Sequence, residues 1–347
     1  MKKFFSIYKD SSTWLLNAVM FLWAAVLLLF KYPWYMAAGF AVIYIAVFII
    51  LNRREQKSVH DFAVVEKQLK RALKDASQNG DAMSLYRILE DKALPEFRKR
   101  MPTKVYKYFP LGYGDTKDGQ RLEMVANNEL WSSIPAGFND PFECEYMYIS
   151  EKELGEIGIP QNAMQRALHL WETLMGAIRE RITTVCFTQN PNDMPMWAHY
   201  ANEHKGFCVE YDIDNPAKLY PVFYTDKRLP AQALFVNLIY SFFNSDAPDD
   251  DRHLLLKHIV LLSAFKDKSW SAENEIRAIF LNGRENLTGN GRLCSCEEIG
   301  IHPTRLFIGV NCSPDNEKRL IDLSEKLQIE YEKCELSSNK FAVVRSH

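Results

Sequence analysis

The sequence lacks a large net charge and the short motifs of several common enzyme classes. Its 42 basic and 44 acidic side chains give a formal net charge of −2. This balance gives no support for a general nucleic-acid binder, although a local basic patch remains compatible with it. The sequence has no Gly-rich phosphate loop of the Walker or dinucleotide type and no Gly-x-Ser-x-Gly nucleophile elbow.

Cysteine and histidine are present, but not in the spacing of a metal site. The seven cysteines form no Cys-x-x-Cys pair, and there is no His-Glu-x-x-His stretch. We therefore predict no metal site. We also expect no disulfide, because thiols stay reduced in the cytoplasm, the compartment predicted below for most of the chain.

Charged side chains are absent from two long segments near the N-terminus. Residues 14–30 and 32–51 contain none, and each run is about long enough to cross a hydrocarbon core of roughly 30 Å. A cleaved signal peptide, the alternative, has a shorter apolar region and no second span directly after it. We therefore predict a transmembrane helical hairpin over residues 1–52.

Basic residues flank the predicted hairpin on both sides, and this sets its orientation. They are Lys2, Lys3 and Lys9 before the first span and Arg53, Arg54 and Lys57 after the second. Loops rich in Lys and Arg stay in the cytoplasm. We therefore expect a two-pass protein whose termini and large C-terminal domain are both cytoplasmic.

Residues 53–100 read as a helical linker. Apolar side chains recur at three- and four-residue steps from Val59 to Leu73, which predicts an amphipathic helix that ends near Asn79. A second helix is expected over residues 82–93, stopped by Pro95. The run of apolar positions is too short for the sustained heptads of a coiled coil, which favours a spacer helix. A homo-oligomer formed through the linker or the hairpin is the alternative.

Residues 101–347 have the pattern of an α+β domain with a mixed sheet, because strands and helices alternate without the regular spacing of a doubly wound sheet. An ordered loop is expected at 137–143. Strands are expected at 105–109, 129–132, 182–188, 207–212, 222–224, 275–281 and 305–310 and near residues 330 and 341. Helices are expected at 121–128, 161–181, 195–202, 252–266 and 315–327.

Two glutamates in the segment 270–277 form the most informative polar constellation. Glu273 and Glu275 are two residues apart at the entry to a predicted strand, so their side chains are expected on the same side. Paired carboxylates raise each other's proton affinity and are common where an enzyme needs a base and an electrostatic stabiliser. The alternative is a solvated strand edge with Arg277 as the counter-ion.

Two further stretches offer groups that could contact a ligand. His199 lies among the aromatic residues Trp197 and Tyr200. The two rings suit stacking on a base or a nicotinamide, or a place in the core, and His199 suits an orienting or a structural role. Asn139 and Asp140 could orient a ligand, but Asn-Asp-Pro is also common turn chemistry.

Five ordered motifs resemble a bacterial family catalogued as a domain of unknown function, numbered 2971. They occupy residues 106–108, 138–143, 186–188, 196–200 with Gly206, and 270–277, within about residues 104–280. Thr188 stands where the family has serine and keeps the hydroxyl. The family name implies no activity. Because the family is bacterial, the resemblance implies that the hairpin lies in the inner membrane.

The order of elements is also similar, more loosely, to that of DarT-like ADP-ribosyltransferases. This resemblance implies an NAD-consuming transferase, a toxin or anti-phage defence effector, that modifies an unknown protein or nucleic-acid acceptor. It gives Glu275 the role of stabilising the ribose cation, and Glu273 that of aligning or deprotonating the acceptor. The expected NAD contacts are Tyr106, Tyr108, Asn139, Asp140, Thr188, Trp197, Tyr200 and Arg277, with His199 as an orienting group.

The sequence departs from this second pattern and leaves other functions open. The opening strand lacks the His or Arg often found there, so Tyr106 or Tyr108 would have to serve. One alternative is a non-catalytic sensor that binds a nucleotide or protein and signals at the membrane. Another is a metal-dependent nuclease or hydrolase built on Asp140, Glu143, Glu273 and Glu275.

Overall fold

The computed structural model describes residues 67–68, 71, 88–114, 116–243, 263–337 and 343–345. The chain divides into two compact units, residues 1–65 and 66–347, and every described residue belongs to the second. The predicted hairpin over 1–52 lies outside the described residues, as does most of the predicted linker. In the part of the chain that is described, no helix has both the length and the apolar character for crossing a membrane.

The described part of the linker ends in a short helical segment. A π-helical turn, Leu89–Ala93, leads into helix α5, Leu94–Arg98. The prediction that Pro95 stops a helix is wrong, because Pro95 lies in the first turn of α5. A proline is well tolerated there, since the first N–H groups of a helix have no intrahelical acceptor.

A ten-stranded mixed sheet organises the second unit and confirms the α+β class. Along it run β11, β2, β4, β1, β5, β12, β13 and β14, while β10 pairs with β4 and β6. Only the pairing of β12 with β13 is parallel. The strands are β1 (Lys104–Phe109), β2 (Glu129–Ser133), β4 (Ile182–Thr188), β5 (Phe207–Ile213), β6 (Leu219–Pro221), β10 (Glu275–Leu281), β11 (Gly291–Ser295), β12 (Ile301–Ile308), β13 (Glu330–Leu336) and β14 (Val343–Arg345).

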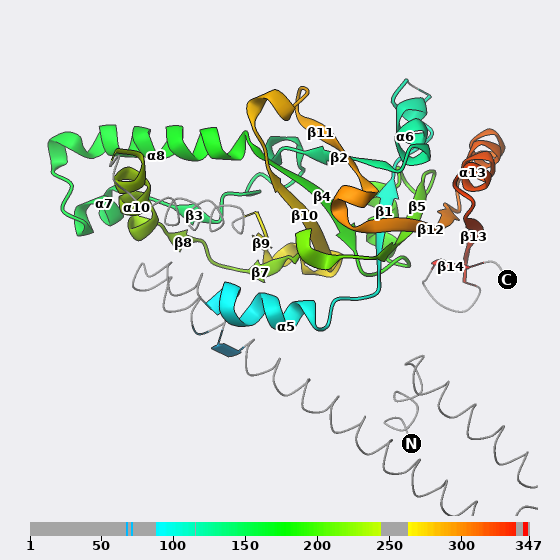
Figure 1. Cartoon of the computed structure of the whole chain (residues 1–347), viewed down its shortest axis with the longest axis horizontal. Coiled ribbons are helices and arrows are strands. Elements are labelled where there is room, and N and C mark those ends of the chain that lie inside the picture. Colours follow the sequence, from blue (N-terminus) through cyan, green and yellow to red (C-terminus); the bar gives the residue numbers. More distant parts are fainter. Residues whose placement is uncertain are drawn as a thin grey trace, which may run out of the picture. The chain divides into compact units, whose positions relative to one another are not determined.

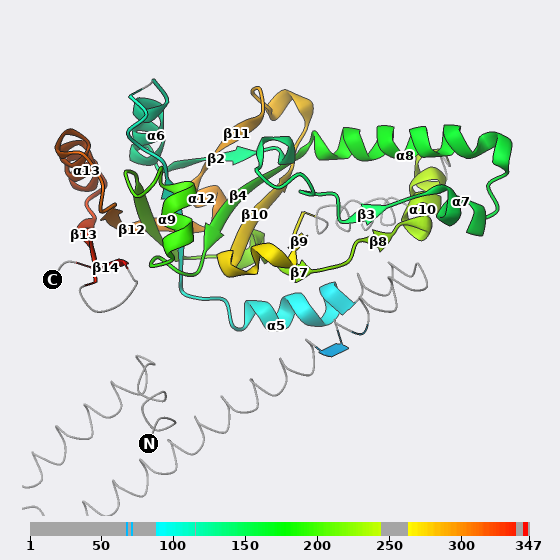
Figure 2. The ribbon, with the colours of Figure 1, turned by 180° about the vertical axis from the view of Figure 1, so that it is seen from behind.

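One face of this sheet carries the main hydrophobic core. Because side chains alternate along a strand, β1 gives Val105 and Phe109 to the core, and β10 gives Ile276 and Ala278. Helices α6 (Thr116–Ala126), α12 (Cys296–Ile299) and α13 (Pro314–Leu327) cover that face, and α6 contacts α13 (Figure 1). On the other face lies α9 (Met194–Tyr200), in front of the sheet in Figure 2.

Strand β4 is the point at which the sheet opens. It pairs along its whole length with β10. It meets β1 only where Thr188 faces Tyr106, and β2 only where Ser133 faces Thr184. Between these two contacts, Lys107 reaches from β1 and donates from Nζ to the Cys186 carbonyl at 3.1 Å. The backbone of β1 and β2 therefore diverges from β4, and side chains take over the contact.

A second group of elements packs separately from the large sheet (Figure 1). It contains α7 (Glu151–Glu156), α8 (Met164–Arg179) and α10 (Gln232–Phe243), with β3 (Met147–Tyr148) paired to β8 (Leu229–Pro230). Trp171 of α8 meets Phe235 of α10 with their ring centroids 6.2 Å apart. Helix α10 was not predicted. Short 3-10 helices occupy Pro135–Gly137, Gln161–Ala163, Pro216–Lys218, Lys268–Glu273 and Arg284–Asn286.

The end of the helix predicted at 252–266 is wrong. Residues 252–262 lie outside the described residues, but Phe265–Asp267 forms strand β9, parallel to β7 (Phe223–Thr225). Phe265 is 2% exposed and stacks on Tyr146 at a centroid distance of 3.9 Å. This stacking fixes the segment as a strand although its apolar run resembles a helix. The other predicted strands and helices within the described residues are confirmed with small shifts at their ends, except that the helix predicted at 121–128 begins five residues earlier, at Thr116.

Candidate functional site

A cavity of about 350 Å³ lies where β1, β2 and β4 meet. Helix α9, the turn at 137–139 and the segment 266–277 complete its wall. Most of the predicted site residues line it: Tyr106, Tyr108, Asn139, Thr188, His199, Tyr200, Glu273, Glu275 and Arg277. The structure thus brings together residues from five separate stretches of the sequence.

The two glutamates converge, but not for the reason predicted from the sequence. Glu273 ends the 3-10 helix Lys268–Glu273, and Asn274 turns the chain with a left-handed φ of 45°. Glu275 then opens β10. The two side chains are therefore not neighbours on one strand. They approach each other because both carboxylates bond to the same lysine, Lys266.

Lys266 is a central residue of the site that sequence reasoning missed. Its Nζ lies 2.6 Å from Oε2 of Glu273 and 3.4 Å from Oε2 of Glu275, and 4.8 Å from the ring centroid of Trp270. Burial alone would lower the pKa of Lys266, but the two carboxylates outweigh it and raise the pKa. The only signal in the sequence was a charged residue at the end of an apolar run.

Glu275 is an ionised carboxylate held from two sides. Its Oε1 and Oε2 accept from Nε and Nη2 of Arg277 at 2.8 and 2.9 Å, and the Cys186 side chain adds a hydrogen bond. Burial opposes the charge, but Arg277 and Lys266 outweigh it and lower the pKa of Glu275 to about 2. The group therefore carries a negative charge at any physiological pH.

Arg277 is fully buried and all its donors are used. Nη1 bonds to Glu143 and to the Ser263 carbonyl, Nη2 to Glu143 at 3.1 Å and to Glu275, and Nε to Glu275. A guanidinium has five N–H donors, so none remains for a ligand. That Arg277 contacts NAD stays a prediction: the residue lines the cavity but has no unused N–H donor. It is the counter-ion of the carboxylates, and a buried one, not one at a solvated strand edge.

Glu273 has fewer bonds than Glu275 and borders helix α9. Tyr200 donates from its hydroxyl to Oε1 of Glu273 at 2.6 Å, and Asn139 donates to the Tyr200 oxygen at 3.4 Å. Burial and the neighbouring Glu273 carboxylate both raise the pKa of Tyr200. Tyr200 therefore stays protonated and presents a neutral hydroxyl and a ring to the cavity.

Three predicted contacts line the cavity with their hydroxyls already bonded. Thr188 donates to the Glu273 carbonyl at 2.7 Å and accepts from the Asn190 N–H. Tyr106 donates to Glu210, and Tyr108 donates to the Asn190 carbonyl, both at 3.1 Å. The Thr188 hydroxyl holds the end of the 3-10 helix, and its bond to a ribose stays a prediction. The two tyrosines offer their rings.

Two predicted residues lie outside the cavity. Trp197 is 0% exposed, donates from Nε1 to the Pro191 carbonyl at 3.0 Å and meets Tyr108 edge-on, so its predicted stacking on NAD is wrong. Asp140 is buried, and its Oδ1 accepts from the Phe142 N–H at 2.9 Å. Asp140 lines a different hollow, which makes it a turn residue and not a contact of this cavity. His199 lines the cavity and is exposed.

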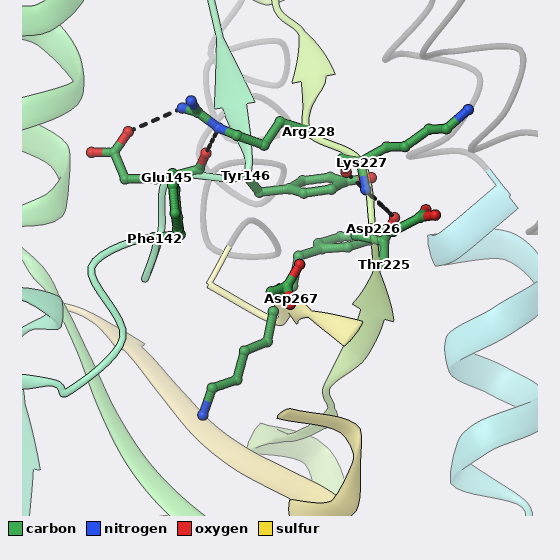
Figure 3. A pocket seen from close by; sticks show the side chains of 10 residues that line it. Phe142, Glu145, Tyr146, Thr225, Asp226, Lys227, Arg228 and Asp267 are labelled. Atoms are coloured by element: carbon green, nitrogen blue, oxygen red, sulfur yellow. Dashed lines mark hydrogen bonds and ion pairs between the residues drawn. The ribbon is translucent and has the colours of Figure 1, made fainter. Parts of the chain in front are cut away.

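A smaller hollow of about 220 Å³ shares Lys266 with the cavity (Figure 3). Tyr146 and Phe265 form its stacked aromatic wall. Arg228 donates to the Glu145 carbonyl and carboxylate, as the dashed lines in Figure 3 show. Glu145 and Arg228 of this hollow are thus paired with each other, and Lys266 pairs with the two glutamates of the cavity.

Among the described residues, no group of three or more His, Cys, Asp or Glu side chains is placed to hold a metal ion. Of the four carboxylates considered for a metal-dependent nuclease, Asp140 faces elsewhere and Glu143 pairs with Arg277.

The residues that pair around Lys266 come from one continuous stretch of the chain. Residues 196–278 match the model of a family described as Protein of unknown function (DUF2971). The predicted resemblance is confirmed over that stretch. The DUF2971 match contains Tyr200, Lys266, Glu273, Glu275 and Arg277, whereas Tyr106 and Tyr108 precede it. Comparison with curated proteins and with solved structures gave no match.

Proposed function

We propose that the cavity binds NAD and that the protein is an ADP-ribosyltransferase-like enzyme that consumes it. One observation carries the proposal. Two buried carboxylates, Glu273 and Glu275, stand in the wall of a cavity that is otherwise rich in aromatic rings. Its volume of about 350 Å³ falls within the range of small-molecule sites, roughly 300–1,000 Å³.

The charges of the site suit a cationic reacting group. Glu143, Glu273 and Glu275 face only two cations, Arg277 and Lys266, within their bonded cluster. Lys107 also lines the cavity, and burial lowers its pKa. The cluster therefore favours positive charge in the cavity, and the nicotinamide ring of NAD carries such a charge.

The chemistry follows from where the charge goes. When the bond between the ribose C1′ and the nicotinamide nitrogen breaks, its electron pair leaves with the ring, which departs as neutral nicotinamide. The ribose becomes an oxocarbenium-like cation, and a fixed carboxylate stabilises it more than it stabilises the ground state. The acceptor nucleophile then bonds to C1′ and releases its proton to water.

Nicotinamide release from the full-length chain tests the proposal. NAD labelled in the nicotinamide ring is incubated with the wild type, with the double variant Glu273→Gln/Glu275→Gln and with Glu123→Gln, an exposed glutamate of α6. Candidate protein and nucleic-acid acceptors are supplied. We expect release from the wild type and Glu123→Gln and loss of release in the double variant. No release from the wild type with any acceptor contradicts the proposal.

The cellular setting is part of the same proposal. We propose that the residue 1–52 hairpin anchors the chain in the bacterial inner membrane with the catalytic unit in the cytoplasm, as a toxin or anti-phage effector. Support comes from the two uncharged runs and their basic flanks. Protease accessibility in intact spheroplasts tests the orientation, because the proposal places only the turn near Lys31 outside.

A non-catalytic sensor is the second candidate, and a specific observation favours it. All five donors of Arg277 are used, and Glu275 is bonded at both oxygens, so part of the site is built like a stable core. Saturable binding of NAD or another nucleotide without any nicotinamide release, unchanged by Glu275→Gln, would support the sensor.

A further inference from the structure

The two carboxylates of the site are bonded very differently. Both oxygens of Glu275 accept from Arg277, at 2.8 and 2.9 Å, and Oε2 also faces Lys266 at 3.4 Å. Its backbone is equally held, because its N–H donates to the Tyr224 hydroxyl and its carbonyl accepts from the Val222 N–H. The hydrogen bonds of the Glu275 carboxylate are thus made to other residues of the protein.

Glu273 keeps capacity for a ligand. Its Oε1 accepts one bond, from Tyr200, and its Oε2 one, from Lys266, each at 2.6 Å. A carboxylate has about four lone-pair sites, so about two stay available. The Tyr200 hydroxyl that donates to Glu273 is a half-buried group of the cavity wall, and Asn139 beside it is exposed. Glu273 therefore differs from Glu275 in its unused acceptor sites, although the two residues are similarly buried, at 8% and 6% exposed.

We propose that the two carboxylates have separate tasks, which divides the roles within the proposed function. Glu273, with Tyr200, is the carboxylate that contacts the ligand and faces the developing positive charge. Glu275 is a positioning residue. It holds Lys266 and Arg277 in place, and Lys266 in turn holds Glu273. This reverses the assignment that the sequence resemblance implies, in which Glu275 faces the sugar.

Stability separates the two tasks without any need for activity. Glu275→Gln leaves the buried Arg277 with half of its charge partners, and we expect the Tm to fall by roughly 10 °C. Glu273→Gln leaves Lys266 with Glu275 and keeps an oxygen for Tyr200, so the Tm should fall by less than in Glu275→Gln. Glu123→Gln is the matched control and should not change the Tm.

Nicotinamide release and NAD affinity test the ligand contact. Glu273→Gln should lower the release rate roughly 100-fold or more while the chain stays folded. Tyr200→Phe should weaken NAD binding. Glu275→Gln, measured below its Tm, should keep part of the release. It should also bring the alkaline limit of nicotinamide release to lower pH, because Lys266, which holds Glu273 while protonated, loses the carboxylate that raises its pKa most. A purely structural glutamate would not move that limit.

The outcomes separate this division of roles from the proposed function. If the wild type neither binds NAD nor releases nicotinamide, the proposed function fails, while the Tm contrast still supports or refutes the positioning role of Glu275. If Glu275→Gln is as stable as the wild type and abolishes release, whereas Glu273→Gln stays active, the division is overturned and Glu275 is the ligand-facing carboxylate.

Discussion

Glu275 and Arg277, two residues apart on β10, form a two-bond ion pair in which Nε reaches Oε1 at 2.8 Å and Nη2 reaches Oε2 at 2.9 Å. Alternation along a strand puts both side chains on one face, so the pair is encoded locally. Glu143 completes the charges around the guanidinium from a distant loop. Through Glu143, Arg277 thus links the loop that follows residues 137–139 to the central sheet.

Replacement of Arg277 by lysine should destabilise the fold strongly. A lysine has one ammonium in place of a planar fork of five donors, so it leaves Glu143 or Glu275 without a partner. Breaking a buried pair in this way costs about 3–5 kcal/mol in the free energy of unfolding. Chemical denaturation measures it. Arg284→Lys is the control, because Arg284 and its partner Glu180 are exposed. This substitution should change the free energy of unfolding by about 0.5 kcal/mol or less. Equal effects would contradict the structural role of Arg277.

Acid should destabilise the wild type over a pH range that the pKa of Glu275 sets. The pKa of Glu275 is about 2 in the folded protein and near 4.5 in the unfolded chain, so the unfolded state binds the proton first. The stabilisation is complete above about pH 4.5 and is lost as the pH falls towards 2, by about 3 kcal/mol in all. Denaturation measured at several pH values checks the slope. In Glu275→Gln this part of the pH dependence should disappear, and an unchanged slope would show that the pKa is not lowered.

Trp197 and Tyr200 should respond oppositely, although both lie on α9. Trp197→Phe removes the bond to the Pro191 carbonyl and some packing, which should lower the free energy of unfolding by about 1–3 kcal/mol. It should leave NAD affinity within about twofold. Tyr200→Phe should weaken NAD binding with little effect on stability. Calorimetric titration and denaturation measure both. The reverse pattern would place Trp197 in the cavity.

Gly206 should not accept even alanine. A Cβ there would lie 2.1 Å from the Phe109 carbonyl oxygen, which neither backbone can relieve easily. Gly206→Ala should therefore cost about 1–3 kcal/mol of stability, in the manner of an overpacked core. Gly119→Ala is the control, since nothing lies within 4 Å of its Cβ and it sits inside α6, so it should stabilise by up to about 1 kcal/mol. Equal values would argue against this close approach.

The central strands could be predicted from the sequence, because runs of β-branched and aromatic residues are a local property, whereas β3, β6, β8, β9 and β11 were not predicted. The strands at 182–188 and 275–281 have the predicted bounds. The predicted helix at 252–266 fails at its end because stacking of Phe265 on Tyr146, far away in the sequence, decides the local structure. An apolar run alone does not separate a buried strand from a helix.

The membership of the cavity could be predicted, but the bonding within it could not. Motif order correctly brought Tyr108, Thr188 and Glu275 to one cavity. It did not reveal that Thr188 bonds to a backbone carbonyl or that Lys266 links the two glutamates. These contacts depend on which neighbour each side chain meets across the fold, and that information is not in the spacing of any one motif.

Calorimetric titration of NAD into the full-length chain tests the central claim most directly, with Ser133→Phe as the blocked variant. Ser133 lines the cavity, and a phenyl ring at that position would fill part of it. We predict saturable binding of one NAD per chain in the wild type and loss of binding in a folded Ser133→Phe protein. Absence of binding in the wild type, or equal binding in both, would contradict the account.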